Sequence, residues 1–412
     1  MRIQLWSYNY DPEPTGIGPI SKVWAEGLRD LGHDIYVVAA HPHYPSPDWG
    51  TRLTPYRERR NGIPVLRLPL WIGRETAAQR YRQELSFMTA QTLAAPLLPR
   101  SDVIVSVSPS FPALLPAILN QRVRRTPWVA WLHDLLPDGA ASSGLVDEAS
   151  AMLKAARGLE RWAYREADRI VVLSEAFTEN LLTKGVPREK IELIYDPASR
   201  VPRPDPPPKR IDPPRILSMG NIGYSQGMAA LVRAFEQDST LTGDDVRLVI
   251  TGNGVEADSV RAEIRGDKTE MLGLVDDERL ERELQEATLA FVSQLHDGAE
   301  FNIPSKIMNF MAYGLPIVAA VNPRSEVARI VERSGAGWVV DSGAPETFPT
   351  TLAAILADPG EIARRAEASR TYAQEHFTQE GFARRFDESL REVVERAASA
   401  RRIGWTPRRR TV

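Results

Sequence analysis

The chain has 412 residues, which is enough for two domains of ordinary size. Its 51 Lys and Arg residues nearly balance its 54 Asp and Glu residues, and the net charge of −3 provides no bulk positive field for nucleic acid. The lack of cysteine excludes disulfides and thiolate sites, and no apolar run reaches the roughly 18 residues of a membrane-spanning helix. We therefore expect a globular cytoplasmic protein that binds no nucleic acid and carries no signal peptide.

The N-terminal half alternates short β-branched runs with amphipathic stretches, which is typical of βαβ units. We expect a helix over residues 19–31 and strands over residues 3–8, 34–40, 65–68, 102–107, 128–133, 169–174 and 191–195. Because parallel strands need crossover connections, this pattern predicts an α/β domain over residues 1–196 with a parallel sheet covered by helices. Ligands of such sheets bind beyond the carboxyl ends of the strands.

A proline-rich segment, residues 197–214, interrupts this pattern and is expected to be a linker. The alternation then restarts and predicts a second doubly wound domain over residues 215–379. Its expected strands are residues 215–219, 246–251, 289–293, 317–321 and 337–340, with helices over 228–235 and 276–287. The last helix, at about residues 380–399, is expected to pack back on the first domain, and residues 400–412 form a basic tail.

Glycine-containing loops follow the first strand of each predicted domain. The first loop, residues 9–19, contains Gly16 and Gly18 before a helix, and it is either a ligand-binding loop or an ordinary βα turn. The second loop, residues 220–227, contains three glycines, which favours contact with a ligand because glycine is costly where it is not needed. A third turn, residues 251–254, has the same character, and for it the simpler interpretation of a tight turn is at least as good as that of ligand contact.

Ser305 and Lys306 stand near the start of a helix that Pro304 is expected to begin and Asn302 to cap. A cation adds to the positive end of the helix dipole, so its presence there indicates an anionic ligand, for which phosphate or diphosphate is the natural candidate. The alternative is a surface lysine, which the apolar neighbours make less attractive.

His133 and Asp134 follow the buried strand expected at residues 128–133. A histidine at the carboxyl end of a central strand faces the ligand crevice, where it could donate a hydrogen bond or move a proton, although a structural role is the alternative. The six histidines show no metal-ligand spacing, so no metal site is predicted.

Six segments in this order resemble glycosyltransferase family 4, in its colanic-acid and exopolysaccharide branch: GIG, HDLLPD, VVLSEAF, KGVPREKIELI, GNIGYSQG and IPSKIMNFMAYGLPIVAAV. The resemblance covers nearly the whole chain. It implies the GT-B fold, in which two Rossmann-like domains face a central cleft. It also implies a retaining transferase without an essential metal or other cofactor, whose co-substrate is a nucleotide-diphosphate sugar, for which we expect a UDP-sugar. The acceptor would be a glycan, a lipid-linked molecule or a small molecule.

The resemblance also implies roles for individual residues. Lys306 would stabilise the leaving diphosphate, His133 would lie near the transferred sugar, and Glu300 would be the sugar-binding acid. Asp134 and Tyr10 would lie on the acceptor side. The donor would contact the following residues: Gly16, Gly18, Gly220, Asn221, Gly223, Gln226, Asn253, Pro304, Ser305 and Asn309.

The chain departs from the family at two places. Asn221 and Gln226 stand where many members have Arg and Lys, and Phe301 and Asn309 stand where they have two glutamates. Glu300 lies one residue from the first of these positions. The family's preferences for donor sugar and nucleobase therefore do not extend to this chain. Lys306 is expected to bear more of the diphosphate charge than it does in other members.

Two other functions remain open at this point: a non-catalytic scaffold that binds nucleotide sugars, and a sugar-nucleotide epimerase or hydrolase of the same fold. The tail contains five arginines around Ile403 and Trp405. It would either rest on anionic lipid at the inner face of a membrane or form a solvated terminus.

Overall fold

The computed structural model describes residues 1–14, 16–43, 49–73, 76–108, 114–134, 151–202, 212–296 and 303–402. The chain forms two compact units, of which unit 1 comprises Met1–Tyr195 and Gln379–Val412, and unit 2 comprises Asp196–Thr378. The predictions for Glu300, Phe301, Asn302 and the tail beyond residue 402 lie outside the described residues.

Unit 1 is built on an eight-stranded sheet with the order β3-β4-β2-β1-β5-β6-β7-β8. The strands are β1 (Arg2–Ser7), β2 (Asp34–Ala40), β3 (Tyr56–Arg60), β4 (Ile63–Leu68), β5 (Val103–Ser108), β6 (Trp128–Leu132), β7 (Arg169–Val172) and β8 (Ile191–Leu193). All neighbouring strands run parallel except β3 and β4, which are antiparallel. The central strands β5 and β6 are buried along their whole length, which explains their apolar sequences.

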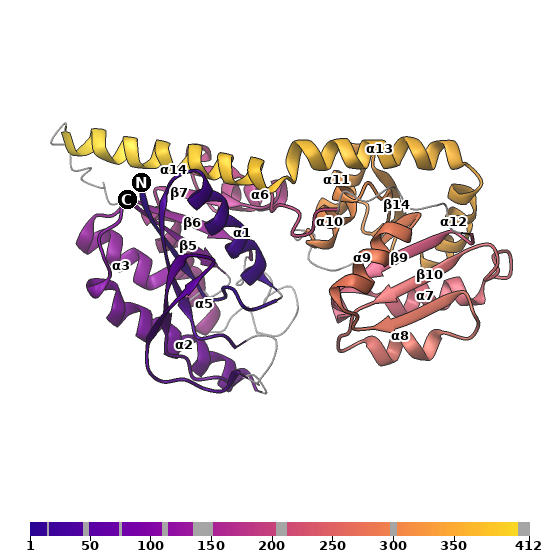
Figure 1. Ribbon diagram of the computed structural model, residues 1–412, viewed down its shortest axis with the longest axis horizontal. Helices are drawn as coiled ribbons and strands as arrows, with labels where there is room; N and C mark the ends of the chain where they lie inside the picture. Colours follow the sequence, from indigo (N-terminus) through magenta and orange to yellow (C-terminus); the bar gives the residue numbers. More distant parts are fainter. Residues whose placement is uncertain are drawn as a thin grey trace. The chain divides into compact units, whose positions relative to one another are not determined.

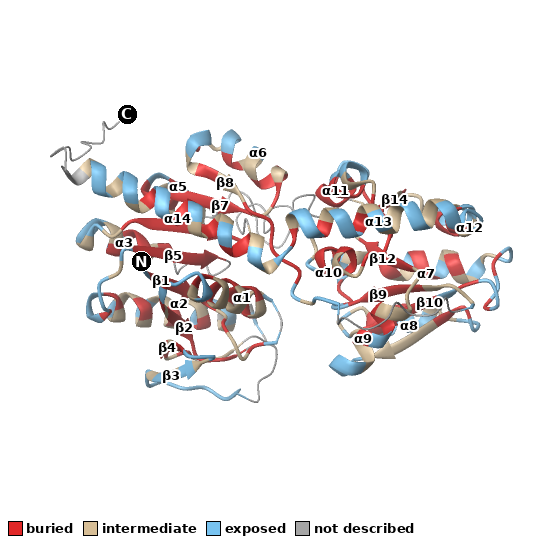
Figure 2. Cartoon of the chain, turned by 45° about the horizontal axis from the view of Figure 1, so that its top comes forward, coloured by how far each residue is buried: buried red, intermediate tan, exposed pale blue. Residues whose placement is uncertain are grey.

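Helices cover both faces of this sheet, so that its strands are enclosed (Figures 1 and 2). They are α1 (Ile17–Asp30), α2 (Ala77–Ala94), η2 (Ala95–Leu97), α3 (Leu114–Arg124), α5 (Ala151–Glu166), α6 (Glu175–Thr183), η4 (Arg188–Lys190) and α14 (Gln379–Arg402). Two of them begin at side-chain caps: the Thr76 side chain accepts a hydrogen bond from the backbone N–H of Gln79 at α2, and the Ser174 side chain accepts one from the backbone N–H of Phe177 at α6.

The C-terminal helix α14 completes the core of unit 1. Its residues Phe382 and Phe386 are buried beside Trp131 of β6, with ring centroids 5.8 and 5.0 Å from the indole. Gly27 permits the close approach of α1, because a Cβ atom there would lie 2.7 Å from the Cβ of Ala383. Thus the last helix of the chain packs against α1, which lies near the start of the chain.

Unit 2 contains a six-stranded parallel sheet with the order β11-β10-β9-β12-β13-β14. Its strands are β9 (Arg215–Met219), β10 (Arg247–Thr251), β11 (Thr269–Gly273), β12 (Leu289–Ser293), β13 (Ile317–Val321) and β14 (Gly337–Asp341). Its helices are η5 (Tyr224–Gln226), α7 (Met228–Gln237), α8 (Ala257–Glu263), α9 (Asp277–Glu286), α10 (Lys306–Ala312), α11 (Glu326–Ser334), η6 (Pro345–Thr347), α12 (Phe348–Leu356) and α13 (Pro359–His376).

The start of unit 2 differs from the expected linker. Asp196 and Ala198 are 5% and 3% exposed, and the backbone N–H of Ala198 donates to the carbonyl of Phe377 at 2.8 Å. The first residues after β8 are therefore built into unit 2, and residues 203–211 lie outside the described part of the chain.

The four strands over residues 34–40, 215–219, 289–293 and 317–321 are confirmed to the residue. The predicted helix over 19–31 begins two residues earlier, at Ile17, and the strand expected to end at residue 195 ends at Leu193. Strands β3 and β11 were not predicted. No helix among the described residues is both long and apolar enough to span a membrane.

Candidate functional site

The strand order of unit 2 predicts a ligand site between β9 and β12. The chain proceeds outward in one direction through β9, β10 and β11, and in the other through β12, β13 and β14. In open parallel sheets of this kind, the crevice beyond the carboxyl ends at such a reversal receives the ligand. The glycine loop after β9 and the segment that follows β12 therefore flank the expected position.

The loops after β9 and β10 are joined through their backbones. The N–H of Gly220 donates to the carbonyl of Thr251, and the N–H of Ile222 donates to the carbonyl of Asn253, both at 3.0 Å. A Cβ atom on Gly252 would lie 1.8 Å from the carbonyl oxygen of Gly220, and one on Gly254 would lie 2.2 Å from that of Ile222. The glycines of the residue 251–254 turn are thus required by packing, which is the simpler of the two interpretations.

The glycines of the loop after β9 have different local reasons. Gly220 has φ +99°, and no atom of the described residues lies within 4 Å of a Cβ built there. Gly227 has φ +57°, and a Cβ there would lie 2.7 Å from the Leu295 side chain. A Cβ atom at Gly223 would lie 2.9 Å from the side-chain amide nitrogen of Asn221. Gly220 alone of these three presents bare backbone to open space, as a glycine that admits a ligand would do.

The segment after β12 packs on this loop. The backbone N–H of Leu295 donates to the carbonyl of Ser225 at 2.8 Å. Residues 297–302 lie outside the described part of the chain, and the chain is described again from Ile303 to α10. The structure therefore brings the end of β12 directly beside the glycine loop, as the strand order requires.

Lys306 is the first residue of α10, and its side chain is buried. The residue is 9% exposed, and its Nζ atom has no hydrogen-bond partner within the described ranges. Burial lowers the pKa of this ammonium group from 10.5 to about 8, so that it is still mostly charged at neutral pH. A buried charge without a partner is costly, which indicates that an anion is its intended partner.

The start of α10 and the contacts of the residues around Lys306 differ from those predicted from the sequence. The helix begins at Lys306 rather than at Pro304, and Ser305 is an exposed N-cap residue whose side chain caps no backbone group. Asn309, one turn after Lys306, is 6% exposed. Its side-chain oxygen accepts from the backbone N–H of Arg200 at 3.0 Å and from the Ser199 hydroxyl at 3.3 Å. That oxygen is therefore used to hold the start of unit 2 against α10.

The two polar residues that were expected to stand in place of family cations, Asn221 and Gln226, lie within the glycine loop. Asn221 is exposed, and its backbone carbonyl accepts a hydrogen bond from the Gln226 side chain. Asn253 is also exposed, and its side chain accepts a hydrogen bond from the backbone N–H of Gly254 at 2.9 Å. None of these three side chains carries a positive charge.

In unit 1, the first glycine loop is shaped by a buried carboxylate. Glu13 is 2% exposed and accepts hydrogen bonds from the backbone N–H groups of Tyr10 at 3.2 Å and His43 at 2.8 Å. A Cβ atom on Gly18 would lie 2.7 Å from the Glu13 carbonyl oxygen, while Gly16 has φ +66°. Glu13 was not among the residues predicted from the sequence, although its position between two prolines was an available signal.

Tyr10, expected on the acceptor side, lies in the hydrophobic core of unit 1 and is 1% exposed. Burial raises the pKa of its hydroxyl. A side chain in this position packs against the sheet, so its observed role is structural.

His133 follows β6 directly, as predicted, and Asp134 comes next with intermediate exposure. The imidazole packs against the Trp131 ring with centroids 4.5 Å apart, and its Nε2 atom is buried. Burial lowers the pKa of His133 to about 3. The ring is therefore neutral under ordinary conditions and can donate one hydrogen bond, but it does not carry a positive charge. It belongs to unit 1, whereas Lys306 belongs to unit 2.

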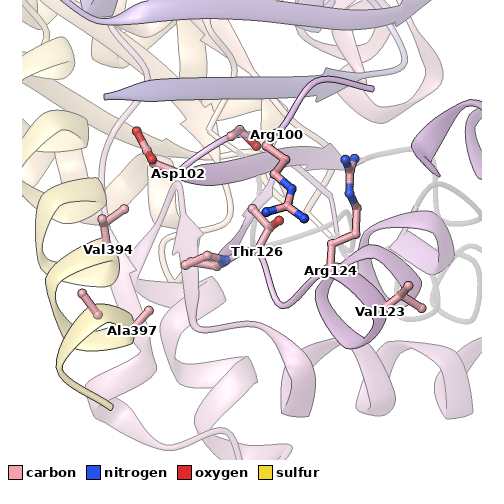
Figure 3. A pocket seen from close by; sticks show the side chains of 10 residues that line it. Arg100, Asp102, Val123, Arg124, Thr126, Val394 and Ala397 are labelled. Atoms are coloured by element: carbon pink, nitrogen blue, oxygen red, sulfur yellow. The ribbon is translucent and has the colours of Figure 1, made fainter. Parts of the chain in front are cut away.

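Unit 1 also contains a pocket of about 450 Å³ at the amino ends of its strands. Residues that precede β5 and β6, including Arg100, Asp102 and Thr126, line it together with Val394 and Ala397 of α14 (Figure 3). Because these residues lie at the amino ends of the strands, this pocket is separate from the carboxyl edge that carries His133. The described residues hold no group of three or more His, Asp or Glu side chains placed for a metal ion.

Family models match both units. A glycosyl transferase 4-like domain model matches residues 15–197, and a glycosyl transferases group 1 model matches residues 213–358. Among curated proteins, the chain is 23% identical over 414 residues to WcaI of Escherichia coli, named for colanic acid biosynthesis, covering 95% of this chain and 100% of that protein. It is 23% identical to the amylovoran biosynthesis glycosyltransferase AmsK of Erwinia amylovora, over 57% of this chain and 58% of AmsK.

Solved structures share the architecture of the whole chain. Sucrose-phosphate synthase from Thermosynechococcus elongatus matches with a TM-score of 0.70 and 17% identity, covering 96% of this chain and 100% of that one. Anabaena HepE in complex with UDP matches with a TM-score of 0.65 and 17% identity, covering 95% and 100%. At these identities the likeness concerns the fold.

Proposed function

The chain belongs to glycosyltransferase family 4 and has the GT-B fold of two Rossmann-like domains, and from this premise we propose that it transfers a sugar from a nucleoside-diphosphate donor to an acceptor hydroxyl. The reaction serves the synthesis of a polysaccharide. This setting is supported by the relatives WcaI and AmsK, which are named for colanic acid and amylovoran biosynthesis.

The observation that carries the proposal is the buried Lys306 ammonium group. It lies at the start of α10 and has no partner among the described residues, in the unit whose strand order predicts a ligand site after β9 and β12. A diphosphate would neutralise this charge in surroundings from which water is largely removed, where such an interaction is strong. In the reaction the same contact would stabilise the negative charge that grows on the leaving diphosphate.

The donor is proposed to be a UDP-sugar. Among the matched structures, Anabaena HepE is solved with UDP and with UDP-glucose. In this chain the exposed backbone of Gly220 lets a phosphate approach, while Asn221, Gln226 and Asn253 offer uncharged hydrogen-bonding groups nearby. Because these groups carry no charge, Lys306 bears the main electrostatic contact with the diphosphate.

We assign the reaction a retaining course. The bond between the sugar's anomeric carbon and the diphosphate oxygen breaks, and the acceptor oxygen forms a bond to that carbon from the same face. The acceptor proton passes to the departing phosphate oxygen, so no protein base is required. His133, as a neutral imidazole, would donate a hydrogen bond to the sugar or the acceptor, and Glu300 would bind sugar hydroxyls. The protein's main contribution is then positioning and charge stabilisation.

The test is turnover of the Lys306→Ala variant. We expect a fall of about 10²–10³-fold in transfer rate, as when another key transition-state donor is removed. Lys306→Arg serves as the partner variant, because it keeps the charge and should recover part of the rate. Near-normal turnover of a folded Lys306→Ala protein would contradict the assignment. Binding of the donor with neither transfer nor hydrolysis would favour the scaffold, and an altered sugar nucleotide without any acceptor would favour an epimerase or hydrolase.

A further inference from the structure

Unit 1 contains a second hollow, which we call the α5 recess, and its lining is strongly basic. It has a volume of about 510 Å³, which is within the usual range for small-molecule sites. Two arginines of α5, Arg161 and Arg165, line it together with Lys184 and Lys190 from the segment between the end of α6 and η4. Of the described residues that line the recess, none is acidic.

The α5 recess lies away from the edge of the sheet that carries the candidate site. Arg165 shortly precedes β7, which begins at Arg169, and Lys190 directly precedes β8, which begins at Ile191. The recess is therefore at the amino ends of these strands, whereas His133 follows the carboxyl end of β6. A ligand in the recess would not be the donor or the acceptor of the proposed transfer.

The two lysines have structural contacts that fix the walls of the recess. The Lys184 ammonium group donates to both carboxylate oxygens of Glu160, at 3.0 and 3.1 Å, and Glu160 is only 3% exposed. The Lys190 ammonium group donates to the carbonyls of Arg165 and Ala167, at 2.9 and 2.8 Å, where α5 ends. These bonds hold the connection between α6 and β8 against α5.

The two arginines have no such contacts. Both are exposed, and neither guanidinium group makes a hydrogen bond or an ion pair with a described residue. They are four residues apart on one helix, a spacing at which like charges repel and destabilise the helix. An anion between them would remove this repulsion, and the planar guanidinium group matches the oxygen atoms of a phosphate in pairs.

Gly158 is the second observation that points to a ligand. It lies in the interior of α5 and lines the recess, although glycine lowers the stability of a helix interior. A Cβ atom built there has no atom of the described residues within 4 Å, so packing gives no reason for the glycine. Arg161 and Arg165 follow it by three and seven residues, which places all three within about 60° around the helix axis. The bare backbone thus lies beside the two arginines, where it lets a ligand approach closely.

We infer that the α5 recess binds a small molecule that carries several phosphate groups, which contact Arg161 and Arg165 while the ligand rests against Gly158. A lipid surface is a poorer occupant, because the large apolar side chains of the lining, Tyr164 and Val186, are only 5% and 7% exposed. The site is separate from the proposed donor site around Lys306, and the inference does not depend on which sugar is transferred.

The test is calorimetric titration of the full chain with inorganic tripolyphosphate. The titrated protein carries Lys306→Ala, because a polyphosphate could otherwise also bind at Lys306. We expect saturable binding of one tripolyphosphate per chain, which weakens as salt is raised. Inorganic phosphate should bind at least about tenfold more weakly, because a single group does not reach both arginines. Adding Arg161→Gln with Arg165→Gln should weaken tripolyphosphate binding at least about tenfold.

Gly158→Ala separates a ligand-binding role from a structural one. Alanine is the better helix former, so this variant should unfold at a higher denaturant concentration than its parent. Its methyl group would occupy the place of the ligand, so tripolyphosphate binding should nevertheless weaken at least about tenfold. A residue with a purely structural role would not improve stability and weaken binding together.

Arg282→Gln with Arg396→Gln is the matched control, because it removes the same charge from two exposed arginines outside the recess and should bind tripolyphosphate like its parent. In the otherwise original protein, Arg161→Gln with Arg165→Gln should leave UDP binding unchanged, which distinguishes this site from the donor site. The inference is overturned if tripolyphosphate does not bind saturably or binds no tighter than phosphate. It is also overturned if the recess arginine pair or Gly158→Ala binds like the parent, or if the control pair weakens binding equally.

Discussion

Gly252 lies so close to the carbonyl oxygen of Gly220 that a Cβ atom there would be 1.8 Å from it. The two glycines belong to neighbouring loops of unit 2, and their contact sets the shape of the surface on which the donor is proposed to bind. Gly252 also has φ +127°, a conformation that side chains rarely adopt.

Gly252→Ala should therefore separate the two loops. We expect a loss of at least about 2 kcal/mol in the free energy of unfolding, since backbone strain and a backbone clash act together, and weaker binding of nucleoside diphosphate. Gly335→Ala is the matched control: Gly335 has φ +63° but no atom of the described residues within 4 Å of its Cβ position. It should cost about 1 kcal/mol and leave binding unchanged. Denaturant unfolding and calorimetry measure both, and equal effects of the two variants would refute the role of the contact.

Asn309→Ala removes the acceptor for the Arg200 N–H and the Ser199 hydroxyl. Because these donors then lose their partner at a site where Asn309 is only 6% exposed, unfolding should become easier by about 1–3 kcal/mol. Asn309→Asp keeps an oxygen in the same place and should retain the stability at neutral pH. If Asn309→Ala unfolds at the same denaturant concentration as the original protein, the contact has no stabilising role.

Lys306 should make stability and diphosphate binding depend on pH in opposite ways. Its pKa falls from 10.5 when unfolded to about 8 when folded, so the unfolded chain binds more protons between these values. The ligand-free protein should consequently gain stability as pH rises from 8 to 10.5. Below pH 8, Lys306→Met should be more stable than the original by an amount on the order of 3 kcal/mol.

Diphosphate affinity should fall above pH 8, because the ammonium group that attracts the anion is then lost. Unfolding curves and titrations at several pH values check both trends. The pH dependence is not due to Lys306 if Lys306→Met shows the same slope as the original protein.

His133 should reduce stability in acid. Its pKa falls from 6.5 in the unfolded chain to about 3 in the folded protein, so the unfolded chain binds more protons in this range. Stability should decline as pH falls below 6.5, by up to about 1.4 kcal/mol per pH unit from this residue. His133→Gln should lose less over the same range. Proton NMR can measure the pKa of the His133 imidazole in the folded protein. A value near 6.5 would contradict this prediction.

Much of the fold could be predicted from the sequence because its strands are short, β-branched and bounded by polar or glycine residues. Strands β9, β12 and β13 meet this description and were located to the residue. β3 was missed because its sequence, Tyr56 to Arg60, is almost wholly charged, as suits an edge strand with alternate residues exposed. Such a strand is recognised only when its partner β4 is known.

The candidate site could be predicted from the sequence only in part. The apolar neighbours of Lys306 predicted a buried lysine, and the structure confirms that burial. A glycine in the loop after a strand can serve either a ligand or packing, and the sequence does not distinguish the two. In the structure Gly18 lies against the Glu13 carbonyl and Gly252 against the Gly220 carbonyl. Tyr10 was expected on the acceptor side from the family resemblance, but the direction of a loop side chain cannot be read from its neighbours in the chain.

The most direct test of the account is calorimetric titration of the purified protein and its Lys306→Ala variant with UDP, GDP, ADP and TDP, without metal and then with Mg²⁺. We expect one diphosphate, UDP, to bind with micromolar affinity without metal. The variant should bind it at least about tenfold more weakly, because a charge-assisted contact is lost. Failure of every diphosphate to bind, or equal binding by the variant, would contradict a donor site built around Lys306.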